Sequence, residues 1–419
     1  MVNIVLTILG MGATVIMPFV FTILGIVFGM KMKEAIRSGI TVGIGFTGIN
    51  LALGLISNNL GEIVPALSER WHLSLTITDV GWPAASGIAF GSGTFVATSI
   101  LVYLTVNAIF LLLKWTHTLN LDIFNMWHFI LIGMLTYVAT DKYWIGITAG
   151  TVMMMVNTIT AERQENVICD FAGEQWRGLT FSTQGLPAQL YFSRGCNWVL
   201  DHIPGLNKIY FNLNELPASV SFFAEPAILG LILGCIISTL AGYGWQDIIS
   251  VGMSMAAAMY LLPKMVGIMM EGLSTITDAA REFMAKRFSG RQFNLAMDYC
   301  MLMGEKEVIT MGLLFIPIVL LLAVILPGNQ FLPFTDLPSL AYWCIGPVYG
   351  CKHNSFRSII VTLFSMILAL YMVTNLAPLF TTAAIQSGFA VASGQTVGGL
   401  CLGFEWFGYL IHKIFAFIF

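Results

Sequence analysis

Long apolar runs alternate with short polar segments along most of the 419-residue chain. A helix needs about 20 apolar residues to cross the hydrocarbon core of a bilayer. By this measure we predict eleven spanning helices, near 4–30, 39–58, 95–114, 123–140, 144–160, 220–242, 247–270, 309–327, 338–350, 357–376 and 397–419. The hydropathy pattern therefore indicates an all-α polytopic membrane protein.

Two apolar stretches between these helices are interrupted by glycine and proline: DVGWPAASGIAFGSG (79–93) and PGNQFLPFTDLP (327–338). Irregular backbone at membrane depth is tolerated only where it is buried in protein or lines a wet cavity. We therefore predict re-entrant segments here. Their candidate solute-binding residues are Asp79, Trp82, Asn329, Gln330 and Asp336.

The two halves of the chain resemble each other. Four pairs align in order at a nearly constant offset: Pro18 with Pro226, Asp79 with Asp298, Asp122 with Asp336, and Lys142 with Lys352. Each unit holds five predicted helices, and an odd number inverts the second unit relative to the first. Inverted repeats recur in transporters. We predict repeats at 1–160 and 220–376, a cytoplasmic connector at 161–219, and an outer loop with a terminal helix at 377–419.

Composition and charge narrow the class of protein. Hydrophobic residues make up 57% of the chain and charged residues 10%, whereas soluble domains carry about 25% charged residues. The net charge of −3 excludes a basic nucleic-acid footprint. Sixteen of the nineteen Lys and Arg residues fall in alternate loops, which predicts an outer N-terminus and a cytoplasmic C-terminus.

Cofactor and nucleotide chemistry is not indicated. The seven cysteines are scattered and form no CxxC pair, which argues against a zinc site or a disulfide framework. We therefore predict neither a metal nor a cofactor. The sequence has no GxxxxGK[ST] loop, so energy for transport comes from an ion gradient or from another protein.

Ionisable residues within apolar segments are costly, which makes them functional candidates. Asn125 and His128 share one helix face, Glu225 begins the sixth predicted helix, and Asp298 precedes the eighth. Carboxylates and amides suit a polyol, and a tryptophan face suits its C–H side. Structural alternatives stay open. Asp79, Asp122 and Asp336 could be N-caps, His128 an interhelical hydrogen-bonding residue, and Glu225 a first-turn acid.

Several motifs resemble a known family. DVGWPAAS (79–86), LDIFNMWH (121–128), IPGLNKI (203–209), FAEP (223–226) and PGNQFLPFTDL (327–337) are similar to the galactitol-type enzyme IIC of the bacterial phosphoenolpyruvate-dependent sugar phosphotransferase system. That family is related to the ascorbate transporters of the same system. The likeness implies a homodimer in the bacterial inner membrane. Its scaffold would come from 4–58 and 220–270, and its mobile substrate core from 79–160 and 298–376.

The same resemblance implies a mechanism. A sugar alcohol such as galactitol binds from outside, moves inward, and receives a phosphoryl group from enzyme IIB, which with IIA is a separate chain. Asp298 would orient or deprotonate the accepting hydroxyl. Gln184, in FSTQGLP (181–187), is a further candidate for substrate contact, although the galactitol-type pattern has histidine there. Because IIB supplies the phosphoryl group, the enzyme status of this chain alone stays open. The alternative is an ion-coupled secondary transporter.

Overall fold

The computed structural model describes residues 13–70, 75–91, 94–122, 124–213, 225–287, 293–333, 335–389, 391 and 393–419. The predicted helix segments at 4–12 and 220–224 lie outside these residues.

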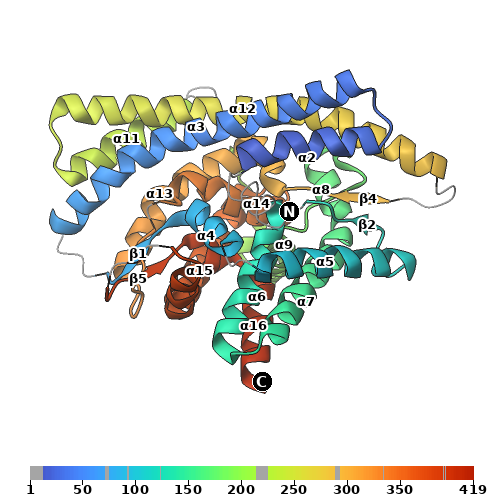
Figure 1. The fold of residues 1–419 in the computed structure, drawn as a ribbon. Helices are drawn as coiled ribbons and strands as arrows, with labels where there is room; N and C mark the ends of the chain where they lie inside the picture. The colour runs from blue at the N-terminus through green and yellow to red at the C-terminus, as the bar shows by residue number, and fades with distance from the viewer. Residues whose placement is uncertain are drawn as a thin grey trace.

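Four helices form one layer of the molecule (Figure 1). They are α2 (Ala13–Val27), α3 (Met32–Arg70), α11 (Pro226–Ala241) and α12 (Trp245–Arg287). At 39 and 43 residues, α3 and α12 are much longer than a bilayer requires,. They pack against each other, and α2 and α11 pack against them. These helices come from both predicted repeats.

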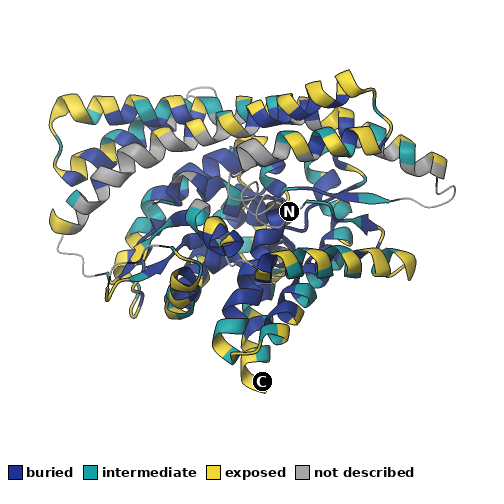
Figure 2. Ribbon diagram, in the orientation of Figure 1, coloured by how far each residue is buried: buried dark blue, intermediate teal, exposed yellow. Residues whose placement is uncertain are grey.

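The other long helices form the body below this layer (Figure 1). Within the described chain they are α4 (Gly81–Phe90), α5 (Thr94–Leu112), α6 (Trp127–Thr140), α7 (Tyr143–Glu162), α9 (Leu186–His202), α13 (Lys306–Ile325), α14 (Leu340–Gly350), α15 (Ser355–Gln386) and α16 (Trp406–Ile418). Figure 2 shows that buried residues concentrate in this body. All residues of α14 but one are buried, so its apolar side chains pack inside the protein rather than against lipid.

Each of the eleven predicted spans overlaps a helix. Four described helices are long and apolar enough to cross a membrane: α5, α7, α13 and α15. The protein is thus mostly helical and polytopic. The segment predicted as a connector contains the short α8 (Glu165–Ala172) and also α9, which packs against α14. The sequence analysis missed helix α9 because polar residues, among them Gln189, Ser193 and Arg194, interrupt its apolar residues.

The described residues are mostly helical, but they also form five strands of two or three residues, which the sequence analysis did not predict. β1 (Ile77–Asp79) pairs in parallel with β5 (Thr396–Gly398). β2 (Thr118–Leu119) and β3 (Leu179–Thr180) both pair with β4 (Asn294–Ala296). Backbone N–H and C=O groups buried at helix breaks need partners. These strands supply them across the two halves of the chain.

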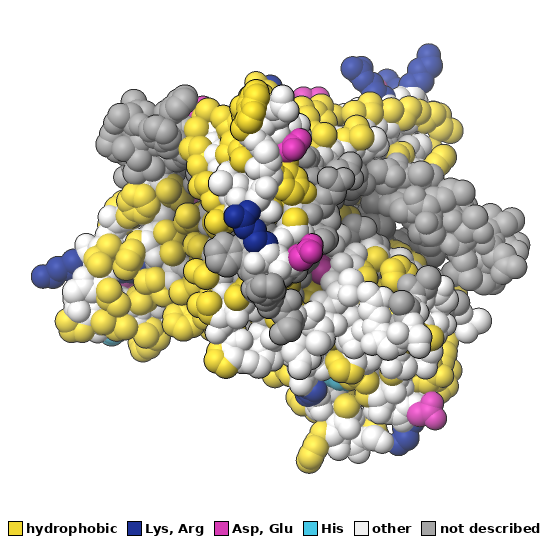
Figure 3. All heavy atoms as spheres, turned by 90° about the vertical axis from the view of Figure 1, so that its left-hand side faces the viewer, with side chains coloured by type: hydrophobic (Ala, Val, Ile, Leu, Met, Phe, Trp, Pro, Cys, Tyr) yellow, Lys and Arg dark blue, Asp and Glu magenta, His cyan; other side chains and the backbone are white. Residues whose placement is uncertain are grey.

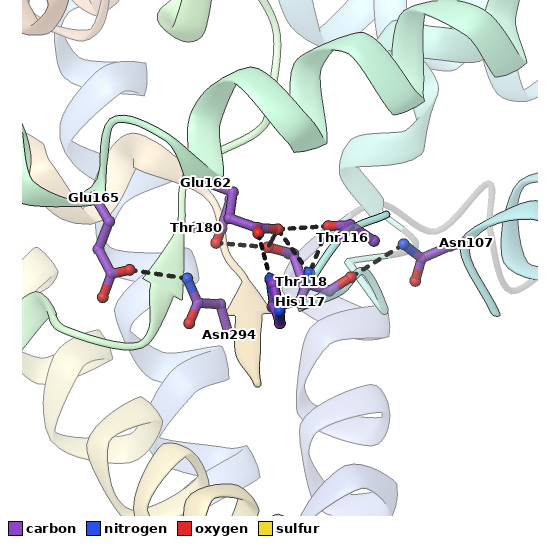
Figure 4. Close-up of polar contacts among 8 residues, drawn as sticks. All are labelled: Asn107, Thr116, His117, Thr118, Glu162, Glu165, Thr180 and Asn294. Atoms are coloured by element: carbon purple, nitrogen blue, oxygen red, sulfur yellow. Dashed lines mark hydrogen bonds and ion pairs between the residues drawn. The ribbon is translucent and has the colours of Figure 1, made fainter. Parts of the chain in front are cut away.

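The three-stranded sheet is fastened to the end of α7 by Glu162 (Figure 4). The Glu162 carboxylate accepts hydrogen bonds from the hydroxyls of Thr116 and Thr118 and from the backbone N–H of His117. The Thr118 hydroxyl also lies 2.9 Å from that of Thr180 on β3. Glu162 therefore holds the loop after α5 and strand β2 against the end of α7.

The outer surface of the body is suited to lipid. α13 and α15 expose large apolar side chains, among them Leu321, Ile325, Phe364 and Leu368. Figure 3 shows a face rich in apolar side chains with few charged ones. Exposed apolar surface of this extent is stable in hydrocarbon rather than in water.

Candidate functional site

The two broken segments predicted at 79–93 and 327–338 meet in the structure. Asp79 ends β1, and its carboxylate accepts hydrogen bonds from the backbone N–H groups of Gly81 (2.9 Å) and Thr335 (2.8 Å). The carboxylate of Asp336 accepts one from the N–H of Trp82 at 2.7 Å. Trp82 also donates through its indole to Ser339 at 3.2 Å. The structure therefore brings Asp79, Trp82 and Asp336 together, and their role in binding substrate stays a prediction.

This junction requires glycine at position 81. Gly81 has φ +73°, a left-handed conformation, and a Cβ there would lie 2.5 Å from Cγ2 of Thr335. Any larger residue would be strained and would push the segments apart.

A second carboxylate pair lies elsewhere in the body. Asp298 accepts hydrogen bonds from the N–H of Cys300 (2.9 Å) and the hydroxyl of Tyr342 (3.0 Å). Asp122 accepts one from the side-chain amide of Asn125 at 2.8 Å, and the two carboxylates are close enough to repel each other. The Asp122 carboxylate also accepts from the backbone N–H of Asn125 at 3.4 Å, as an N-cap would,.

The two carboxylate pairs have the same arrangement of hydrogen bonds and neighbours. Asp79 and Asp298 each accept from the N–H two residues ahead, and each lies beside an aspartate of the other half of the chain. Asp336 accepts from Trp82, whereas it makes no side-chain cap to its own short helix η6 (Leu337–Ser339). Asp336 therefore links two segments, which the N-cap alternative does not explain.

Gln184 lies at the centre of the body and is 1% exposed. Its carbonyl oxygen accepts hydrogen bonds from the hydroxyl of Tyr299 (2.7 Å) and the indole of Trp343 (3.1 Å). Its amide donates to the backbone oxygen of Cys401 at 2.8 Å. Gln184 thus joins the segment before α9 to three other segments. To contact a substrate, its side chain would have to break one of these hydrogen bonds.

His128 pairs with a residue that the sequence analysis did not select. Its Nδ1 lies 2.5 Å from Oε1 of Glu405, and both side chains are buried. Glu405 occupies the N-cap position of α16 but makes no capping hydrogen bond. The ring of Trp127 lies 3.6 Å from that of His128 between centroids. An acid, an imidazole and an aromatic face therefore meet here, and the acid comes from 277 residues further along the chain.

Three predicted residues lie apart from these groups. Glu225 is exposed at the start of α11. Asn329 is buried, but it closes its own loop by donating to the oxygens of Ala323 and Phe331. Gln330 is exposed and accepts from the hydroxyl of Thr76. In this geometry Asn329 and Gln330 position the loop.

The residues missed by the sequence analysis are Glu405, Tyr299, Tyr342 and Trp343. A signal for Glu405 was present, because it is an acid in the apolar run LCLGFEWFGYL (400–410). The aromatic residues gave no such signal, since tryptophan and tyrosine are common in membrane helices.

Long apolar helices around a buried centre of paired acids, amides and aromatic rings define a polytopic membrane protein built to handle a polar solute. The family of the phosphotransferase-system sugar-specific permease component matches residues 7–394. The chain belongs to that family of multi-pass inner-membrane proteins. It is 31% identical over 413 residues to the galactitol-specific EIIC component of Escherichia coli strain K12, covering 98% of this chain and 90% of that protein. The galactitol-specific EIIC component of Escherichia coli O157:H7 matches equally well.

Family membership confirms the resemblance seen in the sequence. It also implies a sugar substrate and partnership with enzymes IIA and IIB of the phosphotransferase system.

Proposed function

We propose that this chain takes up a sugar alcohol, with galactitol as the first candidate, and presents it for phosphorylation by phospho-enzyme IIB. The observation that carries the proposal is the 31% identity to a galactitol-specific component over 98% of the chain. The buried groups are compatible with it, because carboxylates, amides and an imidazole can each bind hydroxyls of a neutral polyol.

The transport pathway in this proposal lies between the two carboxylate pairs. Asp79 with Asp336 and Asp122 with Asp298 each connect the two halves of the chain at a helix break. Their shared plan supports two inverted five-helix repeats, in which the two pairs occupy opposite sides of the membrane midplane. Trp82, Asn125, His128 and Gln184 then lie in or around the substrate region.

In this proposal the body moves relative to the helical layer during transport. The layer of α2, α3, α11 and α12 serves as scaffold, and the remaining helices carry the substrate. The division is supported by Figure 1, where the layer lies across one side of the body. Two copies associate as a homodimer, with the N-terminus outside. The predicted cytoplasmic C-terminus conflicts with the predicted outer loop at Lys142, because Lys142 donates to the backbone oxygen of Phe419 at 2.9 Å. Glu225 and Gln330 stay exposed at the start of α11 and in a loop, respectively.

Asp298 is proposed as the residue that orients or deprotonates the accepting hydroxyl. The hydroxyl oxygen attacks phosphorus, the bond from phosphorus to the IIB cysteine sulfur breaks, and the hydroxyl proton passes to a base. Asp298 is held by Cys300 and Tyr342, so its carboxylate has a fixed direction.

The test uses inverted vesicles containing the chain, with purified general phosphotransferase proteins, IIA, IIB and phosphoenolpyruvate. Labelled hexitols, pentitols and hexoses are supplied, and phosphorylated product is measured. Product that requires both this chain and IIB supports the proposal. If IIB is phosphorylated but no substrate reacts, while a proton or sodium gradient alone drives uptake, the chain is instead a secondary transporter.

A further inference from the structure

Several buried side-chain polar groups on α7, on α9, in the segment before α9 and at the start of α16 have no hydrogen-bond partner among the described residues. They are Oε2 of Glu405, Oδ1 of Asn157, Oγ1 of Thr183 and both side-chain amide atoms of Gln189. We call these four residues the Glu405 cluster. Each is at most 3% exposed. An unsatisfied buried polar group is destabilising, so these groups call for a specific explanation.

The members of the Glu405 cluster are connected through the fold. The side-chain amide of Asn157 on α7 donates to the backbone oxygen of Gln184, next to Thr183. A Cβ at Gly185 would lie 1.6 Å from the carbonyl oxygen of Phe404, the residue before Glu405. Helices α7, α9 and α16 contact one another.

Gln189 lies one helical turn beyond Gly185. Its side-chain amide makes no hydrogen bond among the described residues. Its backbone N–H donates to the oxygen of Gly185. Its side chain lies against Gly346 on α14, where a Cβ would approach its Oε1 to 2.7 Å. One turn earlier on α14, Trp343 donates to Gln184. The aromatic ring of Trp343 stacks on Phe404 with a centroid distance of 5.1 Å.

The chemistry of the cluster matches one class of ligand. Glu405 Oε2 and Asn157 Oδ1 accept hydrogen bonds, whereas the Thr183 hydroxyl and the Gln189 amide both donate and accept. Hydroxyl groups of a polyol meet this set, because each donates one hydrogen bond and accepts others. Among the described residues, no Lys or Arg hydrogen-bonds to these groups. A phosphorylated sugar would meet an acidic group without a compensating cation.

We propose that the Glu405 cluster binds hydroxyl groups of the unphosphorylated sugar alcohol, and that Glu405 is the principal acceptor. His128 holds Oε1 at 2.5 Å and leaves Oε2 for the substrate. The same arrangement disfavours the phosphorylated product and so promotes its release. This inference rests on the proposed function, from which it takes the class of substrate.

A matched control exists within the chain. Glu307 is also buried, at 1% exposure, and it also pairs with a histidine, His353, at 3.3 Å. Its other oxygen accepts from the hydroxyl of Ser355 at 2.6 Å. Glu307 is therefore a buried acid of the same kind with both oxygens engaged.

The experiment measures equilibrium binding of labelled galactitol, and of a panel of hexitols and pentitols, to purified full-length protein in lipid nanodiscs without IIB. We expect Glu405→Gln to weaken binding at least tenfold and Glu307→Gln to change it less than threefold. Thr183→Val removes one hydroxyl without touching the His128 pair, and it should weaken binding about three- to tenfold with an unchanged Tm. Sugar phosphate should compete poorly with the wild-type protein.

The outcomes separate this inference from the proposed function. Wild-type affinity in both Thr183→Val and any folded Glu405 variant would overturn the inference and leave the proposed function intact. Equal loss of affinity in Glu405→Gln and Glu307→Gln, with Thr183→Val unaffected, would also overturn it, since it would indicate a structural effect. Failure of the wild-type protein to bind every polyol in the panel would overturn both.

Discussion

The backbone N–H of Trp82 donates a hydrogen bond of 2.7 Å to the carboxylate of Asp336, across 254 residues of sequence. Asp336 is fully buried, and its second oxygen accepts from the N–H of Cys401 at 3.4 Å. One side chain thus connects α4, the loop before α14 and the segment before α16. A buried carboxylate at this position satisfies main-chain groups that no regular secondary structure satisfies.

Replacing Asp336 should therefore destabilise the body. Asp336→Ala leaves two buried N–H groups without an acceptor, each of which costs about 1–3 kcal/mol. We expect a loss of at least about 2 kcal/mol, seen as a lower Tm of the purified protein in detergent. Trp82→Phe is the control, because it removes the indole bond to Ser339 but keeps the backbone donor. A smaller effect for Asp336→Ala than for Trp82→Phe would contradict this account.

Gly185 offers a separate test of the contact between α9 and the C-terminal segment. A Cβ at this position would lie 1.6 Å from the carbonyl oxygen of Phe404, so Gly185→Ala must force the two segments apart. We expect Gly185→Ala to lower Tm markedly and to reduce folded yield. Gly195→Ala, on the same helix, has nothing within 4 Å of its added Cβ and should raise or preserve Tm,. Equal Tm values for both variants would show that the contact does not form.

The helical segments could be predicted because a helix that crosses a membrane needs a run of about 20 apolar residues. All eleven predicted spans overlap helices of the structure. The contact between the two broken segments around Asp79 and Asp336 was not predicted from the sequence. The ends of α3 and α12 could not be predicted from hydropathy. They continue as polar helix to Arg70 and Arg287, beyond the apolar runs.

The contacts that complete the site depend on long-range packing. The strands β1 and β5 are three residues each and pair over more than 300 positions of sequence, so no local pattern reveals them. Glu405 pairs with His128 over 277 residues. An acid in an apolar helix indicates function, but its partner depends on how α16 packs against α6. Only the structure supplies that packing.

The predicted orientation in the membrane can be tested with reporter fusions. The distribution of Lys and Arg predicts that Phe419 lies in the cytoplasm and that Lys142 lies in an outer loop,. In the structure, however, the Nζ of Lys142 donates to the backbone oxygen of Phe419 at 2.9 Å, so the two residues lie on the same side of the membrane and the two predictions cannot both hold. Alkaline phosphatase inserted beside Lys142 and alkaline phosphatase fused after Phe419 should therefore give the same result, active at both sites if that side is the outer one. Opposite results at the two sites would contradict the contact.

Asp298 gives the sharpest test of chemistry, because its amide variant changes charge with little change in structure. An asparagine at 298 keeps an oxygen that can accept from the N–H of Cys300 and the hydroxyl of Tyr342. We expect Asp298→Asn to keep its Tm and to bind galactitol within about threefold of wild type. Its rate of phosphorylation with IIB should fall about 100-fold or more, the usual contribution of a general base.

Asp79→Asn is the matched control for Asp298→Asn. Asp79 accepts from the N–H of Gly81 as Asp298 does from that of Cys300, but its second oxygen also accepts from the N–H of Thr335. An asparagine there loses that acceptor, so Asp79→Asn should lower Tm more than it lowers the rate per folded molecule. If Asp298→Asn leaves both binding and phosphorylation unchanged, Asp298 serves neither step, and its fixed carboxylate is structural, as that of Asp79 would be.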